Sequence, residues 1–116
     1  MDTMWGDTPI HPIIDQPHEY EITRFDYHND PEDQRNSYLD LTLRWKSTVR
    51  RLRFIRPQKL VIEEGFPSST HGMMILDIRN RQWDDLRVEV ADFEASHGKV
   101  TFYAADVIDL DLEAQA

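Results

Sequence analysis

The sequence predicts a mostly β protein, a single-domain antiparallel sandwich or small barrel of about seven strands. Apolar and polar residues alternate with a period of two along most of the chain after Tyr20, which is typical of strands that bury one face. No segment shows the 3.6-residue period of an amphipathic helix. Turn-forming residues separate the alternating runs at short intervals. Together, these observations favour an all-β architecture.

The chain has 116 residues, which suits one domain with a self-sufficient hydrophobic core. We divide it into an extended, proline-containing arm over residues 1–18, a β domain over 19–112 and a short tail over 113–116. The arm also contains four large apolar residues that favour packing against the domain: Trp5, Ile10, Ile13 and Ile14. A frayed terminus is the alternative that the sequence leaves open.

The first predicted strands lie in the N-terminal half. "YEITRFDYH" covers residues 20–28, and "YLDLTLRWK", the clearest alternation in the chain, covers 38–46. The run "VRRLRFIR" over 49–56 follows and is closed by Pro57. A hairpin joins the second and third of these strands, although Ser-Thr lacks the residues that two-residue turns prefer.

Four further segments complete the sheet prediction. They are "KLVIEE" over 59–64, "MMILDI" over 73–78, "LRVEVADFE" over 86–94 and "KVTFYAADVIDLDL" over 99–112. The nearly continuous apolar run over 73–78 indicates a strand that is buried on both faces. The last segment is too long for one ordinary strand, so we expect a bend or break near Ala104 and Ala105.

A basic island interrupts an acidic chain. The net charge is −9, yet residues 41–62 hold seven basic residues and no acid. A hairpin turning at Ser47 and Thr48 pairs Arg44 with Arg51 and puts Leu41, Leu43, Leu52 and Phe54 on a buried face. The opposite face then collects four cations: Arg44, Lys46, Arg51 and Arg53. Like charges on paired strands destabilise the sheet unless something neutralises them.

The neutralising groups can be internal or external. The flanking blocks are acidic, so pairing with neighbouring carboxylates is the simplest expectation, the candidates being Glu21, Asp26, Asp77, Glu89, Asp92, Asp106 and Asp109. The alternative is an anion-binding or nucleic-acid-binding site at Arg44, Lys46, Arg51 and Arg53, because guanidinium groups bind oxyanions in a bidentate manner. An acidic chain repels phosphate, which makes nucleic acid the less favoured partner.

No catalytic or metal motif is present in the sequence. The five histidines show no metal-ligand spacing and fall in predicted loops or tails: His11, His18, His28, His71 and His97. "SSTHG" places Ser68, Ser69 and His71 in one loop without a nucleophile elbow. We therefore expect no enzyme activity, no metal and no cofactor. The absence of cysteine, signal peptide and apolar span favours a cytoplasmic protein.

Acidic clusters are the remaining candidate binding residues. Trp83 precedes Asp84 and Asp85 in a polar stretch, and aromatic residues beside acids are typical anchors against basic protein partners. The run "DPED" adds Asp30, Glu32 and Asp33. We predict that these six residues contact a basic protein, although such runs also serve simply as solvated surface.

The pattern "LDLTLRW…RLRF…LVIEEGFP…GMMILDI…RQW…LRVEVADFE…GKVTFYAADV" resembles small bacterial β-rich immunity proteins that accompany polymorphic toxins. The similarity covers residues 20–112 and consists of packing positions. It implies a non-enzymatic role, namely binding a cognate toxin and masking its active site. The acidic charge agrees, since an acidic inhibitor can steer toward and cover a basic toxin.

Overall fold

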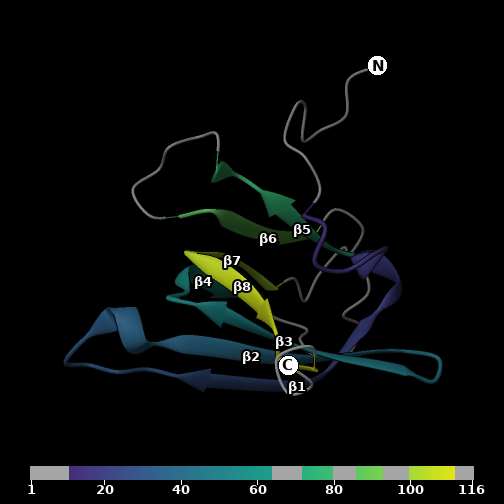
Figure 1. The fold of residues 1–116 in the computed structure, drawn as a ribbon, viewed down its shortest axis with the longest axis horizontal. Coiled ribbons are helices and arrows are strands. Elements are labelled where there is room, and N and C mark those ends of the chain that lie inside the picture. Colours follow the sequence, from purple (N-terminus) through teal and green to yellow (C-terminus); the bar gives the residue numbers. More distant parts are fainter. Residues whose placement is uncertain (1–10, 64–71, 80–85, 93–99, 112–116) are drawn as a thin grey trace.

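The computed structural model describes residues 11–63, 72–79, 86–92 and 100–111. They form two four-stranded antiparallel sheets packed as a sandwich, as predicted (Figure 1). In the first sheet the order is β1 (Glu21–His28), β2 (Tyr38–Trp45), β3 (Thr48–Ile55) and β8 (Asp106–Asp109). In the second sheet it is β4 (Gln58–Ile62), β7 (Val100–Ala104), β6 (Val88–Asp92) and β5 (Met73–Asp77).

Two chain segments bend at one corner and so contribute a strand to each sheet. β3 pairs with β8 in the first sheet, and their continuations β4 and β7 pair in the second. The long predicted run over 99–112 divides at Ala105, whose backbone N–H donates to the Ile55 carbonyl at 2.8 Å. The break expected near Ala104 and Ala105 is therefore confirmed, and it raises the strand number from seven to eight.

The core lies between the two sheets. β2 and β3 supply Leu39, Leu41, Leu43, Leu52 and Phe54, all 1% exposed or less. β6 and β7 supply Val88, Val90, Phe102 and Ala104 from the opposite side. The Phe54 and Phe102 rings meet edge to face with centroids 4.9 Å apart, which is a favourable aromatic geometry. The predicted buried face of the hairpin is thus confirmed.

The hairpin register differs from the predicted one by two residues. The turn is formed by Lys46 and Ser47, because Trp45 pairs with Thr48. Lys46 adopts a left-handed backbone with φ of 58°, the conformation that tight hairpin turns require and lysine rarely supplies. Arg44 therefore lies opposite Val49, and the predicted Arg44–Arg51 pair is wrong. A two-residue shift preserves the faces, so the buried leucines were still assigned correctly.

The described part of the N-terminal arm bends against β5 and is not a plain extended strand. His11 donates its backbone N–H to the Ile75 carbonyl at 2.8 Å, and Gly72 donates to His18 at 3.1 Å. A short 3₁₀ helix, η1 (Pro17–Glu19), follows Gln16, whose φ is 52°. Ile14 is only 3% exposed, so residues 11–20 cover the edge of the second sheet.

A second apolar cluster lies on the outer face of the second sheet. Met74, Leu76 and Ile78 are buried there, with Leu86 and Tyr103 packed against them. β5 is consequently buried on both faces, as its continuous apolar sequence predicts. The part of the chain that the structure describes contains no helix with the length and apolar composition that a membrane crossing requires.

Candidate functional site

The charged residues of the basic island lie on the outer face of the first sheet. β2 and β3 bury their leucines inward, so the intervening residues of the two strands face outward. The register places Asp40 opposite Arg53 and Thr42 opposite Arg51. This arrangement allows ion pairs across the strands, where the predicted register gave repulsion.

Arg53 forms a bidentate ion pair with Asp40. Its Nε lies 2.8 Å from one carboxylate oxygen and its terminal nitrogen 2.9 Å from the other. The guanidinium carbon also lies 4.0 Å from the centroid of the Tyr38 ring. Both side chains are about one third exposed or less, which reduces solvent screening of the pair. The Arg53 guanidinium group is therefore bound at its edge by the Asp40 carboxylate and contacts the Tyr38 ring as well.

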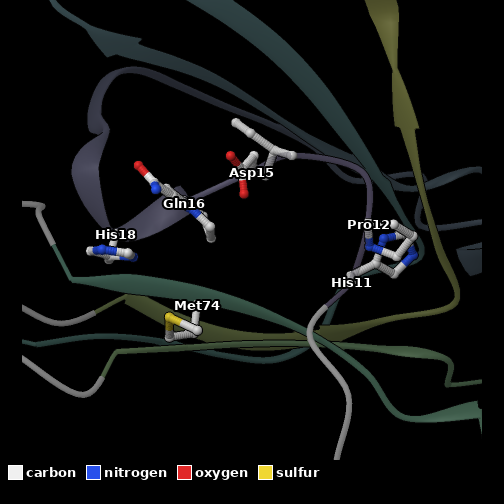
Figure 2. Close-up of a pocket in the computed structure, with 8 residues that line it drawn as sticks. His11, Pro12, Asp15, Gln16, His18 and Met74 are labelled. Carbon is white, nitrogen blue, oxygen red and sulfur yellow. The ribbon is translucent and has the colours of Figure 1, made fainter.

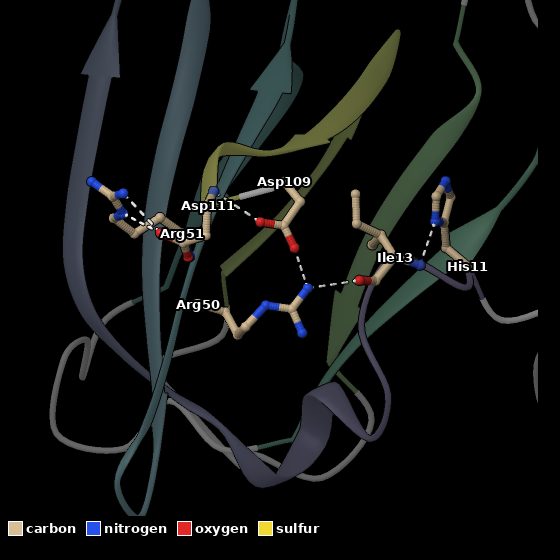
Figure 3. Close-up of polar contacts among 6 residues, drawn as sticks. All are labelled: His11, Ile13, Arg50, Arg51, Asp109 and Asp111. Carbon is tan, nitrogen blue, oxygen red and sulfur yellow. Dashed lines mark hydrogen bonds and ion pairs between the residues drawn. The ribbon is translucent and has the colours of Figure 1, made fainter. Parts of the chain in front are cut away.

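Arg51 binds Asp111, just beyond β8. Its Nε and terminal nitrogen lie 2.9 and 2.7 Å from one carboxylate oxygen, and its backbone N–H donates to the other at 3.1 Å (Figure 3). The Arg51 side chain is 52% exposed, so the contribution of this pair to stability is modest. An anionic ligand at Arg51 or Arg53 would have to compete with carboxylates that already occupy the guanidinium groups.

The remaining two cations of the predicted face lie near the hairpin turn. Arg44 donates its Nε to the Lys46 carbonyl at 3.1 Å. The Lys46 ammonium lies 5.5 Å from the centroid of the Trp45 ring. Neither side chain forms an ion pair with a carboxylate among the described residues, and both are exposed. The four predicted cations therefore separate into two neutralised arginines and two open cations at the turn.

Arg50 lies on the inner side of the hairpin, unlike its neighbour Arg51. It forms an ion pair with Asp109 of β8 and donates to the Ile13 carbonyl at 3.1 Å (Figure 3). The Asp109 side chain is only 5% exposed, and it also accepts the Asp111 backbone N–H at 2.9 Å. This contact joins the first sheet to the arm. Asp109 was among the predicted neutralising acids, whereas Asp40 and Asp111 were not.

A shallow pocket of about 230 Å³ opens on the charged face. Its lining comes from three strands and the segment after β8: Arg24, Asp26, Asp40, Leu41, Thr42, Arg51 and Leu110. Arg24 and Asp26 form an exposed ion pair at 3.5 Å. The pocket therefore presents alternating charges with no excess of either sign, which is unlike a site built for phosphate.

The predicted acidic contacts Asp30, Glu32 and Asp33 lie in the loop between β1 and β2. One Asp30 carboxylate oxygen accepts the backbone N–H groups of Glu32 and Asp33 at 3.0 and 3.2 Å. Its own backbone N–H donates to the hydroxyl of buried Ser37 at 2.8 Å. Asp30 therefore builds the turn, which is ordinary chemistry for this residue type.

Asp33 is the N-cap of a second 3₁₀ helix, η2 (Gln34–Asn36). Its carboxylate accepts hydrogen bonds from the Arg35 backbone N–H, from Nε and from one terminal guanidinium nitrogen, each at 3.0 Å. These hydrogen bonds lower the pKa of Asp33. Glu32 is exposed at the tip. The carboxylates of Asp30 and Asp33 thus fix the backbone of this loop, whereas the carboxylate of Glu32 is exposed.

Three predicted contacts, Trp83, Asp84 and Asp85, lie outside the described residues, as do Ser68, Ser69 and His71. Of the described histidines, His28 is the last residue of β1, as the predicted strand over 20–28 has it and not in a loop, and it stacks on Tyr38 with centroids 4.8 Å apart. No group of three or more potential metal ligands occurs among the described residues.

A second pocket, of about 290 Å³, lies between the arm and β5. Its lining includes His11, Asp15, Gln16, His18 and Met74 (Figure 2). His11 and His18 lie at opposite sides of the pocket, and the arm runs between them. The Nδ1 of His11 accepts the Ile13 backbone N–H at 3.1 Å, and this hydrogen bond requires an unprotonated nitrogen. Burial lowers the pKa of His11, which agrees with that role.

The comparisons with known proteins give no relative for this arrangement. No protein-family model, curated protein or solved structure matches the chain.

Proposed function

We propose that this protein is a non-enzymatic acidic binding domain, most concretely an immunity or antitoxin protein that covers the active site of a basic toxin. The observation that carries the proposal is the distribution of charge. Arg50, Arg51 and Arg53 are bound by the protein's own carboxylates, whereas the chain as a whole carries a net charge of −9. The charge left for a partner is therefore acidic.

The loop between β1 and β2 is the described part of the proposed contact surface. The loop backbone is fixed by Asp30 and Asp33, and the Glu32 side chain that it carries is exposed. An acidic group at the rim of an interface accelerates encounter with a basic partner. Trp83, Asp84 and Asp85 are further proposed contacts, which rest on the sequence alone.

The test is co-expression with the product of the adjacent reading frame, followed by measurement of growth and of binding to the purified product. We expect rescue of growth and an affinity that falls as salt concentration rises. Glu32→Lys should weaken binding about tenfold, mainly through slower association. Asp15→Lys makes the same charge change on the exposed arm and should leave binding near the wild-type value.

Binding of nucleic acid would be evidence for the alternative function, so it is measured separately. Labelled single-stranded RNA and duplex DNA should not bind the native protein. Salt-sensitive binding to either probe, lost in folded Arg44→Glu or Arg51→Glu variants, would transfer the function to the basic island and contradict the proposal.

A further inference from the structure

The pocket under the N-terminal arm arises because the arm is longer than the edge that it covers. The His11 N–H donates to the Ile75 carbonyl, and the Gly72 N–H donates to the His18 carbonyl. Between these two contacts, residues 12–17 of the arm accompany only residues 73 and 74 of β5. The arm therefore arches away from the sheet edge, and the pocket of about 290 Å³ lies under this arch (Figure 2).

The backbone of the arch is held in one conformation. Pro12 and Pro17 fix their own φ angles and have no N–H group that could pair with β5. Gln16, directly before Pro17, has φ of 52° and ψ of 55°, a left-handed conformation that residues other than glycine rarely adopt. The buried side chains of Ile14 and Pro17 anchor the arch. Strained backbone of this kind is concentrated at binding sites, and a preformed pocket loses little entropy when it binds a ligand.

The pocket combines apolar walls with one unpaired carboxylate. Ile14 and Pro17 of the arm line it together with Met74 of β5, which lies across from them. Asp15 is the one carboxylate among the described lining residues, and it forms no hydrogen bond or ion pair with the described part of the chain. The Gln16 side chain makes no capping hydrogen bond to η1, so its amide oxygen is a second acceptor beside Asp15.

The two histidines at the sides of the pocket do not neutralise this carboxylate. His11 accepts the Ile13 N–H at Nδ1, and burial lowers its pKa, so its ring is uncharged at neutral pH. The Nε2 of His18 lies 3.5 Å from the Glu19 carboxylate, which offsets any charge that His18 gains on protonation. The pocket therefore has an uncompensated negative charge beside apolar walls.

We propose that this pocket binds a small organic cation, namely a primary ammonium group on a compact apolar body. The ammonium group binds the Asp15 carboxylate and the Gln16 amide oxygen, and the apolar body packs against Ile14, Pro17 and Met74. The volume of about 290 Å³ is near the lower limit of known ligand pockets, so the ligand is small. In Figure 1 the arm lies against β5 on the right and the acidic loop between β1 and β2 lies at the left. The site is therefore independent of the proposed toxin binding.

Nuclear magnetic resonance titration with benzylamine, which is a cation at neutral pH, tests the site. It should shift the amide resonances of Ile14, Asp15, His18 and Met74 in a saturable manner. Benzyl alcohol has the same ring without the charge and should bind about fivefold more weakly. Asp15→Asn keeps the shape of the side chain but removes its charge. This variant should weaken benzylamine binding by a similar factor and leave benzyl alcohol binding unchanged.

Glu32→Gln is the matched control, because it removes one carboxylate charge from an exposed position on the acidic loop. It should leave the dissociation constant of benzylamine unchanged, and circular dichroism melting checks that each variant is folded. The proposal would be overturned by a wild type without saturable shifts, or by equal affinity of the wild type and Asp15→Asn for benzylamine. Equal weakening by Glu32→Gln would do the same, since it would mean that only the overall charge attracts the cation.

Discussion

The two sheets bury their inner faces in the same core, but the residues on their outer faces differ in polarity. The outer face of the first sheet carries ion pairs, such as Arg53–Asp40 and Arg51–Asp111. The outer face of the second sheet carries the apolar cluster of Met74, Leu76 and Ile78. The first sheet is therefore a two-sided layer with one wetted face, and the second sheet is buried on both sides at β5.

This contrast shows which parts of the surface can be read as binding surfaces. On the outer face of the first sheet, Arg51 and Arg53 are bound by the carboxylates that lie beside them, Asp111 and Asp40. On the second sheet, the apolar outer face is buried, but the apolar end of β4 is exposed. A binding surface is therefore better inferred from charged groups without an internal partner and from apolar side chains that stay exposed. The charge or hydropathy of a segment in the sequence is a weaker guide.

The largest expected effect comes from the core that both sheets share. Phe54→Ala should lower the free energy of unfolding by about 3 to 5 kcal/mol, because Phe54 is fully buried and contacts the Phe102 ring. Chemical denaturation measures the loss. An unchanged midpoint would mean that the hairpin does not pack its leucine face inward.

The second prediction compares the outer faces directly. Leu76→Ala on the second sheet should cost about 2 to 5 kcal/mol, whereas Thr42→Ala on the first sheet should change stability by about 0.5 kcal/mol or less. Both substitutions are read by the same denaturation experiment. Equal losses would remove the distinction between a buried and a wetted outer face.

A smaller effect is expected from the ion pairs of the first sheet. Arg51→Glu sets a carboxylate beside Asp111 and should cost on the order of 1 kcal/mol, because the site is half exposed. No gain from relieved repulsion is expected, since Arg44 lies opposite Val49. Lys46→Glu makes the same charge change at the exposed turn and should cost less. A larger loss for Lys46→Glu would show that internal pairing does not stabilise Arg51.

The smallest effect concerns pH at the arm that covers β5. The pKa of His11 is lowered in the folded protein, mainly by burial and also by Arg79, while Asp77 and Asp106 act in the opposite direction. Below the ordinary value of 6.5, the unfolded chain therefore takes up this proton more readily than the folded chain. The free energy of unfolding should consequently decrease as pH falls below about 6.5.

His11→Asn separates this contribution from that of the other titrating groups. The Asn side-chain oxygen can accept the Ile13 N–H, but it does not titrate. The variant should show a weaker pH dependence than the wild type between about pH 7 and 5. Denaturation midpoints across that range measure the difference, and identical slopes would contradict a half-buried, neutral His11.

The sequence by itself determined the strands and the faces of the central hairpin. Leu39, Leu41 and Leu43 alternate with polar residues, and an alternating pattern can bury its leucines in only one way. The break at Ala105 was predictable from the excessive length of the last run. The chain's negative charge was likewise a property of composition alone.

Tertiary structure decided the register and the partners. The left-handed backbone at Lys46 placed the turn at Lys46 and Ser47 and so shifted the register by two residues, and lysine carries no sequence signal for that conformation. Asp40 and Asp111 became the partners of Arg53 and Arg51 only through pairings between β2, β3 and β8. Among the described strands, β4 pairs only with β7, because the chain turns a corner that β2 does not follow. Alternation along one strand carries no information about which residues of distant strands lie beside it, because that depends on packing of the whole chain.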